Sequence, residues 1–181
     1  MKIREFLNQN SSIGILAAVV LLVISLFIIF RQISGGGGGQ TIDKRYFLDL
    51  NTGEIFPADI QAVPPIETPS GPHDGEPAGV AAYIVTCGDC KNSYAGMTPS
   101  EVQETGAQIM YLSKYSMEDK QALERARNSE EVTDQAMYTS ELIADVSGNR
   151  WFSMESRDAM QIMENRLDCP GDQSLKPCYP R

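Results

Sequence analysis

The chain has 181 residues and a formal net charge of −9, but its charged and apolar residues are unevenly distributed. Residues 41–181 carry 12 Lys and Arg against 23 Asp and Glu, a net charge of −11. A domain this acidic repels phosphate backbones and anionic lipid head groups, so we expect no nucleic-acid partner. The length allows one domain of ordinary size together with appendages.

A long apolar block occupies residues 13–30 and has the sequence IGILAAVVLLVISLFIIF, without a charge. As a helix it covers roughly 27 Å at ~1.5 Å per residue, close to the ~30 Å hydrocarbon core of a bilayer. It is longer than the ~7–15 apolar residues of a cleaved signal peptide, and Arg31 follows it. We therefore predict a transmembrane helix at residues 13–30 that contacts the lipid bilayer and acts as an uncleaved signal anchor.

The charges that flank this block do not decide its orientation. Lys2 and Arg4 stand before it and Arg31 stands after it. Long domains cross a membrane largely regardless of charge. We therefore expect a single-pass protein in which residues 1–12 are a cytoplasmic N-terminal segment and the C-terminal domain is extracytoplasmic.

Two connecting segments follow the apolar block. Residues 31–45 contain five consecutive glycines, at positions 35–39, and Gly-rich chain is flexible coil, which predicts a linker. Residues 46–78 begin with YFLDLNTGEIF, whose alternation around Asn-Thr-Gly predicts a β-hairpin with a three-residue loop. The rest of that segment holds six of the ten prolines. This composition favours polyproline-like chain and predicts either a strap over a domain or a stiff linker.

Residues 79–181 are predicted to form a small α+β domain of β-hairpins and two helices, with a folded core that begins near residue 80. The apolar run VAAYIVT predicts a buried strand, and the alternating run AQIMYLSKY predicts a second strand that pairs with it. Ser116 followed by Asp119 is a capping signature that indicates a helix. The expected elements are strands at residues 80–86 and 107–115, a helical turn after Thr98, helices at 117–128 and 155–167, and a hairpin at 141–154 with Trp151 on a strand.

Four cysteines carry the most specific chemistry in the sequence, and in one interpretation their thiolates converge on a structural Zn²⁺. Zinc binds four sulfurs tetrahedrally at about 2.3 Å. The Cys-x-x-Cys pair in TCGDCK follows a strand as in a zinc knuckle, although CPGDQSLKPC does not repeat its spacing. The candidate metal ligands are Cys87, Cys90, Cys169 and Cys178. No other cofactor is expected.

In a second interpretation the cysteines form disulfides, which an oxidising compartment and an even number of cysteines favour. Three connectivities are open. Cys169 with Cys178 would close a ten-residue hairpin and leave Cys87 to pair with Cys90. Cross-pairing would instead staple the tail to the first core strand and close a long loop, worth on the order of 4 kcal/mol. A thioredoxin-like dithiol needs the motif to open a helix, and KNSYAGMTP is a poor helix start. Zinc and structural disulfides both remain open.

Other residues offer little catalytic chemistry. His73, beside Asp74 in the Pro-rich stretch, is the only histidine. A lone histidine in such a loop is usually solvated, and no other histidine is present to form a Ser-His-Asp triad. An enzyme is therefore not the expected class. We expect a membrane-anchored extracytoplasmic domain with a structural role or a protein-interaction role toward an unidentified protein, with a thiol-disulfide redox protein as the alternative.

The chain as a whole resembles uncharacterised single-pass proteins of planctomycete-type bacteria. The resemblance rests on the anchor, YFLDLNTGEIFPADIQAVPPIETPSG, the strand with CGDC, YLSKYSMEDKQALE and the ending CPGDQSLKPCYP, about half of the chain. It implies a domain that is anchored in a bacterial cell membrane and exported from the cytoplasm. It implies no activity.

Overall fold

The computed structural model of the protein describes residues 20–25, 42–129, 140–164, 169–171 and 174–181. Of the predicted transmembrane segment, only residues 20–25 lie in this part, where they are helical with exposed apolar side chains. No helix of the described residues is long and apolar enough to cross a membrane. The membrane helix, the cytoplasmic segment and the flexible glycine linker therefore remain predictions. Residues Ile42–Arg181 form one compact unit.

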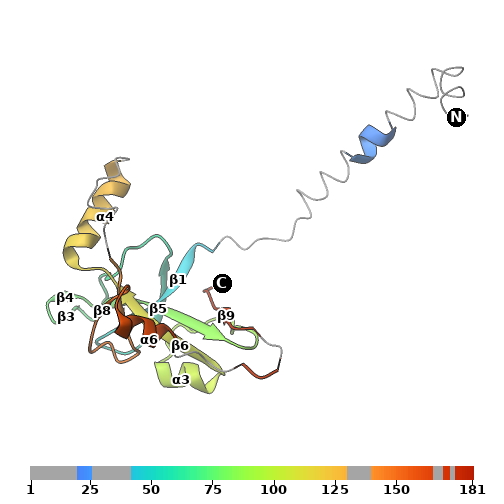
Figure 1. Ribbon diagram of the computed structural model, residues 1–181. Coiled ribbons are helices and arrows are strands. Elements are labelled where there is room, and N and C mark those ends of the chain that lie inside the picture. Colours follow the sequence, from blue (N-terminus) through green and yellow to red (C-terminus); the bar gives the residue numbers. More distant parts are fainter. Residues whose placement is uncertain (1–19, 26–41, 130–139, 165–168, 172–173) are drawn as a thin grey trace, which may run out of the picture. The chain divides into compact units, whose positions relative to one another are not determined.

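An antiparallel sheet is the framework of this unit (Figure 1). In the described residues its seven strands are β1 (Lys44–Asp49), β2 (Ile55–Asp59), β5 (Gly79–Thr86), β6 (Ala107–Lys114), β7 (Leu142–Ala144), β8 (Phe152–Ser153) and β9 (Lys176–Pro177). The order is β2-β1-β5-β6-β7-β8. β1 pairs with the start of β5 and β9 pairs with its end. A separate ribbon of β3 (Pro72–His73) and β4 (Glu76–Pro77) lies between β2 and β5 in the chain.

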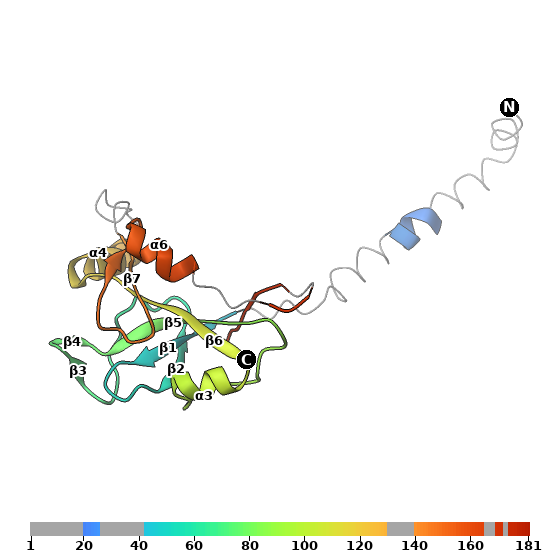
Figure 2. The same cartoon turned by 60° about the horizontal axis from the view of Figure 1, so that its bottom comes forward.

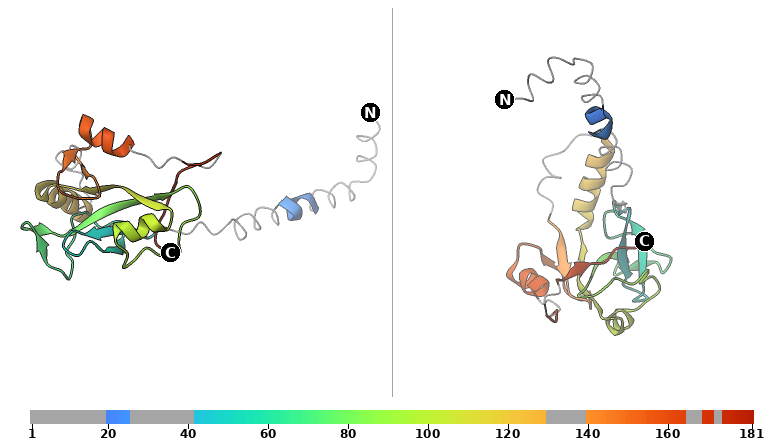
Figure 3. Two further views of the ribbon diagram at one scale, coloured as in Figure 1. Left: turned by 90° about the horizontal axis from the view of Figure 1, so that it is seen from below. Right: turned by 90° about the vertical axis from the view of Figure 1, so that its right-hand side faces the viewer.

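Helices pack on this sheet or extend from it, and those discussed below are α3 (Pro99–Glu104), α4 (Met117–Ser129) and α6 (Arg157–Glu164). α3 begins at a capping box, in which the Thr98 hydroxyl accepts from the Glu101 N–H and the Glu101 carboxylate accepts from the Thr98 N–H. α4 begins after Ser116, whose Oγ accepts from the Asp119 N–H at 3.1 Å, as the capping signature predicted. Figures 2 and 3 show α3 and α6 on opposite sides of the sheet.

Most of the elements predicted for the domain are present. The hairpin around Asn-Thr-Gly is β1-β2, and VAAYIVT and AQIMYLSKY form β5 and β6, which pair as predicted. The hairpin near Trp151 is β7-β8, but Trp151 directly precedes β8 instead of lying on it. The last helix is observed as α6, which begins two residues later than predicted, and residues 165–168 lie outside the described part.

The folded core begins at β1, so the expectation that it begins near residue 80 is wrong. β1 is an inner strand, and its Leu48 lies opposite both Ile55 of β2 and Val80 of β5. Residues 46–78 and 79–181 therefore share one sheet, and the predicted linker ends before Lys44, where β1 starts. Local alternation identifies a strand but does not identify its neighbours in the sheet.

The two faces of the sheet are packed differently, because successive side chains of a strand point to opposite faces. The core face, as we call it, carries the apolar core, including Val80, Leu112 and, from α3, Val102, all 0% exposed. The opposite face, which we call the strap face, carries Phe47, Ala81, Tyr83, Tyr111, Ser113 and Ile143.

Residues 60–68, which we call the strap, run over one end of the strap face. Ile66 and Gly79 exchange two backbone hydrogen bonds, of 2.7 and 2.9 Å. The Tyr115 N–H, just beyond β6, donates to the Pro64 carbonyl at 3.0 Å. The Pro-rich stretch is therefore a strap over the domain and not a stiff linker.

Side chains of the domain also form hydrogen bonds to the strap. The Arg45 guanidinium donates to the Ala62 carbonyl, and the Lys120 ammonium donates to the Pro65 carbonyl. Pro64 and Pro65 are fully buried and are joined by a cis peptide bond. Strap carbonyls that have no partner in a strand thus accept hydrogen bonds from Arg45 and Lys120, so these backbone acceptors are satisfied.

Candidate functional site

All four cysteines lie in the described residues, and they form two disulfides, Cys87–Cys169 and Cys90–Cys178. Each bond joins the loop after β5 to the C-terminal tail, across 82 and 88 residues of sequence. Of the three connectivities that the sequence left open, this is one that staples the tail to the end of β5. The disulfide interpretation of the cysteines is therefore confirmed.

The structure does not support the zinc interpretation of Cys87, Cys90, Cys169 and Cys178. Zinc binds thiolates, and these four sulfurs are bonded to one another in pairs. Within the described part of the chain, no cluster of three or more His, Cys, Asp or Glu residues is suited to a metal ion. A redox dithiol of the Cys-x-x-Cys type closes a bond within the motif, whereas each cysteine of this motif is bonded to the tail.

The Cys90–Cys178 bond determines which way the tail presents its side chains. The Cys178 N–H donates to the Ile84 carbonyl at 2.8 Å, so the tail follows β5 at this point. Cys178 is 5% exposed, belongs to the apolar core, and has its sulfur 3.8 Å from the Tyr94 hydroxyl. Because side chains alternate along an extended segment, a Cys178 on the core face turns Tyr179 toward the strap face.

Three tyrosines from three segments form a row on the strap face. Tyr83 of β5 lies opposite Tyr111 of β6, and their rings stack with centroids 5.0 Å apart and planes 8° apart. Pro177 of β9 lies opposite Val85 of β5. Continuing that antiparallel register by two residues places Tyr179 opposite Tyr83. The row therefore runs across the tail, β5 and β6.

A cavity of about 250 Å³ opens at this row, and we call it the tyrosine pocket. Its volume is below the ~300–1,000 Å³ of most small-molecule sites. A cavity of this size is better suited to one or two side chains of a partner segment than to a whole cofactor. The side chains that give the pocket its character are Tyr83, Tyr111, Tyr179, Arg45, Glu141 and, from the strap, Ile60.

Tyr83 and Tyr111 of the pocket are neutral hydrogen-bond donors. Burial, followed by the neighbouring Tyr83 and Glu141, raises the pKa of Tyr111 to about 12. Burial also raises the pKa of Tyr83, with Tyr179 as the second cause. A protonated phenol both donates and accepts. The pocket therefore combines flat apolar rings with polar ends.

Arg45 and Glu141 give the pocket two opposite charges with different surroundings. The Arg45 guanidinium lies 5.1 Å from the centroid of the Phe47 ring and donates to the strap. Burial lowers the pKa of Arg45, and Glu141 acts in the opposite direction. No ion pair joins the two side chains among the described residues. Among the described residues, the Glu141 carboxylate therefore interacts with Arg45 without a direct ion pair.

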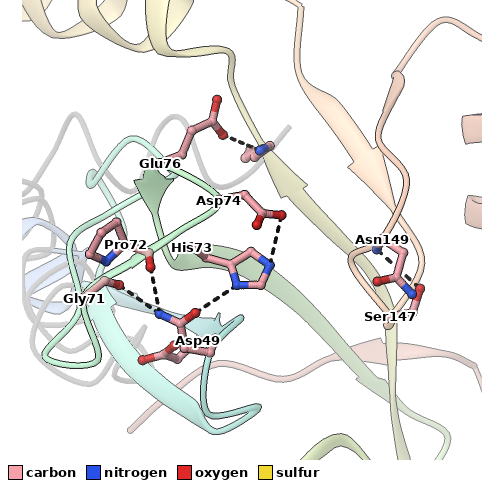
Figure 4. A network of polar contacts seen from close by, with 10 residues as sticks. Asp49, Gly71, Pro72, His73, Asp74, Glu76, Ser147 and Asn149 are labelled. Atoms are coloured by element: carbon pink, nitrogen blue, oxygen red, sulfur yellow. Dashed lines mark hydrogen bonds and ion pairs between the residues drawn. The ribbon is translucent and has the colours of Figure 1, made fainter.

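The lone histidine belongs to a polar network and does not line the tyrosine pocket (Figure 4). His73 Nδ1 lies 2.9 Å from Asn51 Oδ1, and Nε2 lies 3.7 Å from the Asp74 carboxylate. The Asn51 amide also donates to the carbonyls of Gly71 and Pro72, at 3.0 and 3.3 Å. This network connects the β1-β2 turn to β3, which is a structural role.

Asp49 anchors the same turn from within. Its side chain accepts from the Ser70 hydroxyl and from the Asn51 N–H, both at 2.9 Å, and the residue is 6% exposed. Burial by itself raises the pKa of this carboxyl, but the hydrogen bonds from Ser70 and Asn51 outweigh burial, and the pKa lies below its ordinary value. Asp49 is therefore a buried carboxylate that stabilises the fold when it is ionised.

A wider groove of about 1000 Å³ lies between α6, β6 and the β7-β8 turn. Its lining reaches Glu164, the last described residue before 165–168. Nothing in the described residues shows what occupies its open end. We therefore assign no site to it.

The cysteines were predicted from the sequence, whereas the tyrosine pocket was not. The sequence signal for the pocket was weak, because Tyr83 and Tyr111 are each ordinary residues within a predicted strand. Their pairing depends on the register between β5 and β6, which also shifts between Tyr83 and Ile84 and which no local pattern shows. Comparison with protein-family models, with curated proteins and with solved structures finds no match. The interpretation of the site therefore rests on its geometry.

Proposed function

We propose that the protein is a membrane-tethered, extracytoplasmic binding domain that receives a segment of a partner protein in the tyrosine pocket. The observation that carries this proposal is the row of Tyr83, Tyr111 and Tyr179, three rings supplied by three separate segments. Tyrosine is enriched in protein recognition sites because it offers a large rigid apolar surface and a polar end. A domain whose tail is bonded in place to complete such a wall is suited to binding.

Two features support the proposed location. Disulfides persist in oxidising compartments outside the cytoplasm, and this domain has two of them. The charge-free block at residues 13–30 is long enough to anchor the chain. In the sequence, five consecutive glycines lie between this block and the domain. A bacterial cell membrane is the proposed site, in keeping with the resemblance to single-pass bacterial proteins.

Site-specific photo-crosslinking in the native host tests the binding function. We place a benzophenone amino acid at Tyr111 in the full chain, and at Glu124 of α4 in a matched control. Glu124 does not line the pocket, and its side chain is 47% exposed. We expect a crosslinked adduct of defined mass from position 111 and none from position 124. The adduct should weaken when Tyr83→Ala is added.

The outcome that contradicts the function is the same adduct pattern at both positions, or no adduct at position 111. The location has its own test. Protease added outside the cytoplasmic membrane should remove residues 42–181, and the four cysteines should resist alkylation until they are reduced. Protection of the domain from the protease would contradict the orientation without affecting the pocket.

A further inference from the structure

The strap shows how this face of the sheet receives a proline-containing segment. Its Ile66 pairs with Gly79 through the backbone, while Pro64 and Pro65 are completely buried. Donors from the domain, including the Tyr115 N–H, reach strap carbonyls that no neighbouring strand satisfies. The mode of binding thus combines buried proline rings with hydrogen bonds to peptide carbonyls.

The tyrosine pocket continues the surface that the strap covers. Ile60, at the start of the strap, is itself part of the pocket lining. Ala81 of β5 lies opposite Phe47 of β1 on the strap face, and Tyr83 is the next residue of β5 on the same face. Beyond Ile60 the face is thus lined by half-exposed tyrosine rings in place of buried apolar side chains. A second proline-containing segment would find the same kind of surface there, with hydroxyl groups as the donors.

We propose that the partner segment is an extended, proline-rich peptide that carries a Lys or Arg residue. This inference rests on the proposed function, because it names the chemistry of what the same pocket receives. Proline-rich peptides have little conformational entropy to lose and expose their carbonyls, so they bind grooves lined by aromatic residues. Tyr83, Tyr111 and Tyr179 supply ring faces for prolines and hydroxyl donors for carbonyls.

The charge of the domain accounts for the basic residue. Residues 41–181 have a net charge of −11, which attracts a cationic segment and steers its approach. Glu141 lines the pocket and forms no ion pair among the described residues. The guanidinium of Arg45, by contrast, donates through one NH2 group to Ala62 and lies over the Phe47 ring, while its buried Nε has no hydrogen-bond partner. A Lys or Arg of the peptide therefore meets the carboxylate of Glu141.

A selection from a random dodecamer peptide library tests the inference. The target is the full chain in detergent with both disulfides intact, and a parallel selection uses Tyr83→Ala/Tyr111→Ala. We expect the wild-type target to enrich peptides with two or more prolines and at least one Lys or Arg. The double variant should not enrich them. Enriched peptides without proline, or no enrichment at all, would overturn the inference.

Affinities of one enriched peptide for single variants then divide the contributions. We expect Tyr111→Ala to lower the affinity about tenfold or more, as for a central aromatic residue of an interface. Glu141→Gln should lower it about 2–5-fold, and only at low salt. Phe152→Ala and Glu124→Gln are matched controls outside the pocket and should leave it unchanged. Equal losses in the controls would show that the peptide binds elsewhere and would overturn the inference.

The two proposals fail in different ways. If position 111 gives a specific crosslink while the library yields no proline-rich peptide, the binding function stands and the proposed ligand chemistry is wrong. If neither experiment detects binding at the pocket, both proposals are wrong. Circular dichroism and resistance to alkylation show that each variant keeps its fold and its disulfides, so a negative result is not due to unfolding.

Discussion

The core face and the strap face belong to the same sheet but are closed in different ways. The core face is covered by α3, by the loop that carries Tyr94 and by the disulfide-bonded tail, and residues such as Val80 and Leu112 have no exposed surface. The strap face is covered at one end by the strap and is open at the tyrosine pocket. The difference separates two tasks, because the closed face stabilises the fold and the open end of the other face holds the proposed binding site.

The largest expected effect is the loss of the Cys90–Cys178 disulfide, which bonds the tail to the loop after β5. Cys90→Ser/Cys178→Ser should lower the free energy of unfolding by about 3 kcal/mol, because with Cys87–Cys169 intact the bond closes only the short loop of residues 87–90 and 169–178. Urea unfolding with the other disulfide intact measures this. The variant should also weaken crosslinking at the pocket, since Tyr179 is no longer held.

The second disulfide provides the comparison. With Cys90–Cys178 intact, Cys87→Ser/Cys169→Ser opens the same short loop, so chain entropy alone predicts the same loss. Each bond has one buried cysteine, Cys87 or Cys178, but only Cys178 belongs to the apolar core, with Cys90 packed against it, so we expect the Cys90–Cys178 variant to be the less stable of the two. The opposite order would show that burial of the sulfur adds nothing.

The strap can be displaced by one methyl group. A Cβ at position 79 would lie 2.8 Å from Ile66 Cγ1, 2.9 Å from the Ile66 carbonyl oxygen and 3.0 Å from Phe56 Cζ. Gly79→Ala should therefore lower the free energy of unfolding by about 1–3 kcal/mol and speed proteolysis of the strap. Gly88→Ala is the control, since nothing lies within 4 Å of its added Cβ. A neutral Gly79→Ala would mean that the strap does not pack on this face.

Asp49 makes the stability of the β1-β2 turn depend on pH. Asp49→Asn should lower the free energy of unfolding by about 1–2 kcal/mol at pH 7, because a charged acceptor of buried hydrogen bonds is lost. The folded pKa of Asp49 lies below the unfolded value of 3.8, so its contribution is present above that pH and is lost as the pH falls further. Urea unfolding between pH 7 and pH 2 should show a smaller acid loss in the variant. An identical acid slope would contradict the assignment.

The smallest effect at neutral pH is expected in the pocket itself. Tyr111→Phe should leave stability at pH 7 nearly unchanged but should reduce its loss at high pH. The pKa of Tyr111 is raised from 10.0 to about 12, so its favourable contribution is complete below pH 10 and disappears as the pH rises through 12. Unfolding at pH 7 and 11, with tyrosinate absorbance, measures both. Equal alkaline losses in the two proteins would show that Tyr111 ionises normally.

Local signals predicted the elements of the domain, and long-range pairing decided how they meet. VAAYIVT and the Ser116 cap identify β5 and α4 from a few neighbouring residues. The position of β1 inside the sheet depends on contacts with β5, more than thirty residues later in the chain. Of the candidate site, only the cysteines were predicted. The tyrosines were not, since each is ordinary in its own strand.

The sequence by itself determined the acidic charge, the charge-free block, the alternating strands and the four cysteines, because these follow from composition and from spacings of a few residues. Only the tertiary structure decided that the cysteines pair across 82 and 88 residues and that Tyr179 joins Tyr83 and Tyr111. The physical reason is that a one-residue change of register turns every side chain of a strand to the other face. The buried sulfur of Cys178 holds the register of the tail, and with it the wall of the pocket.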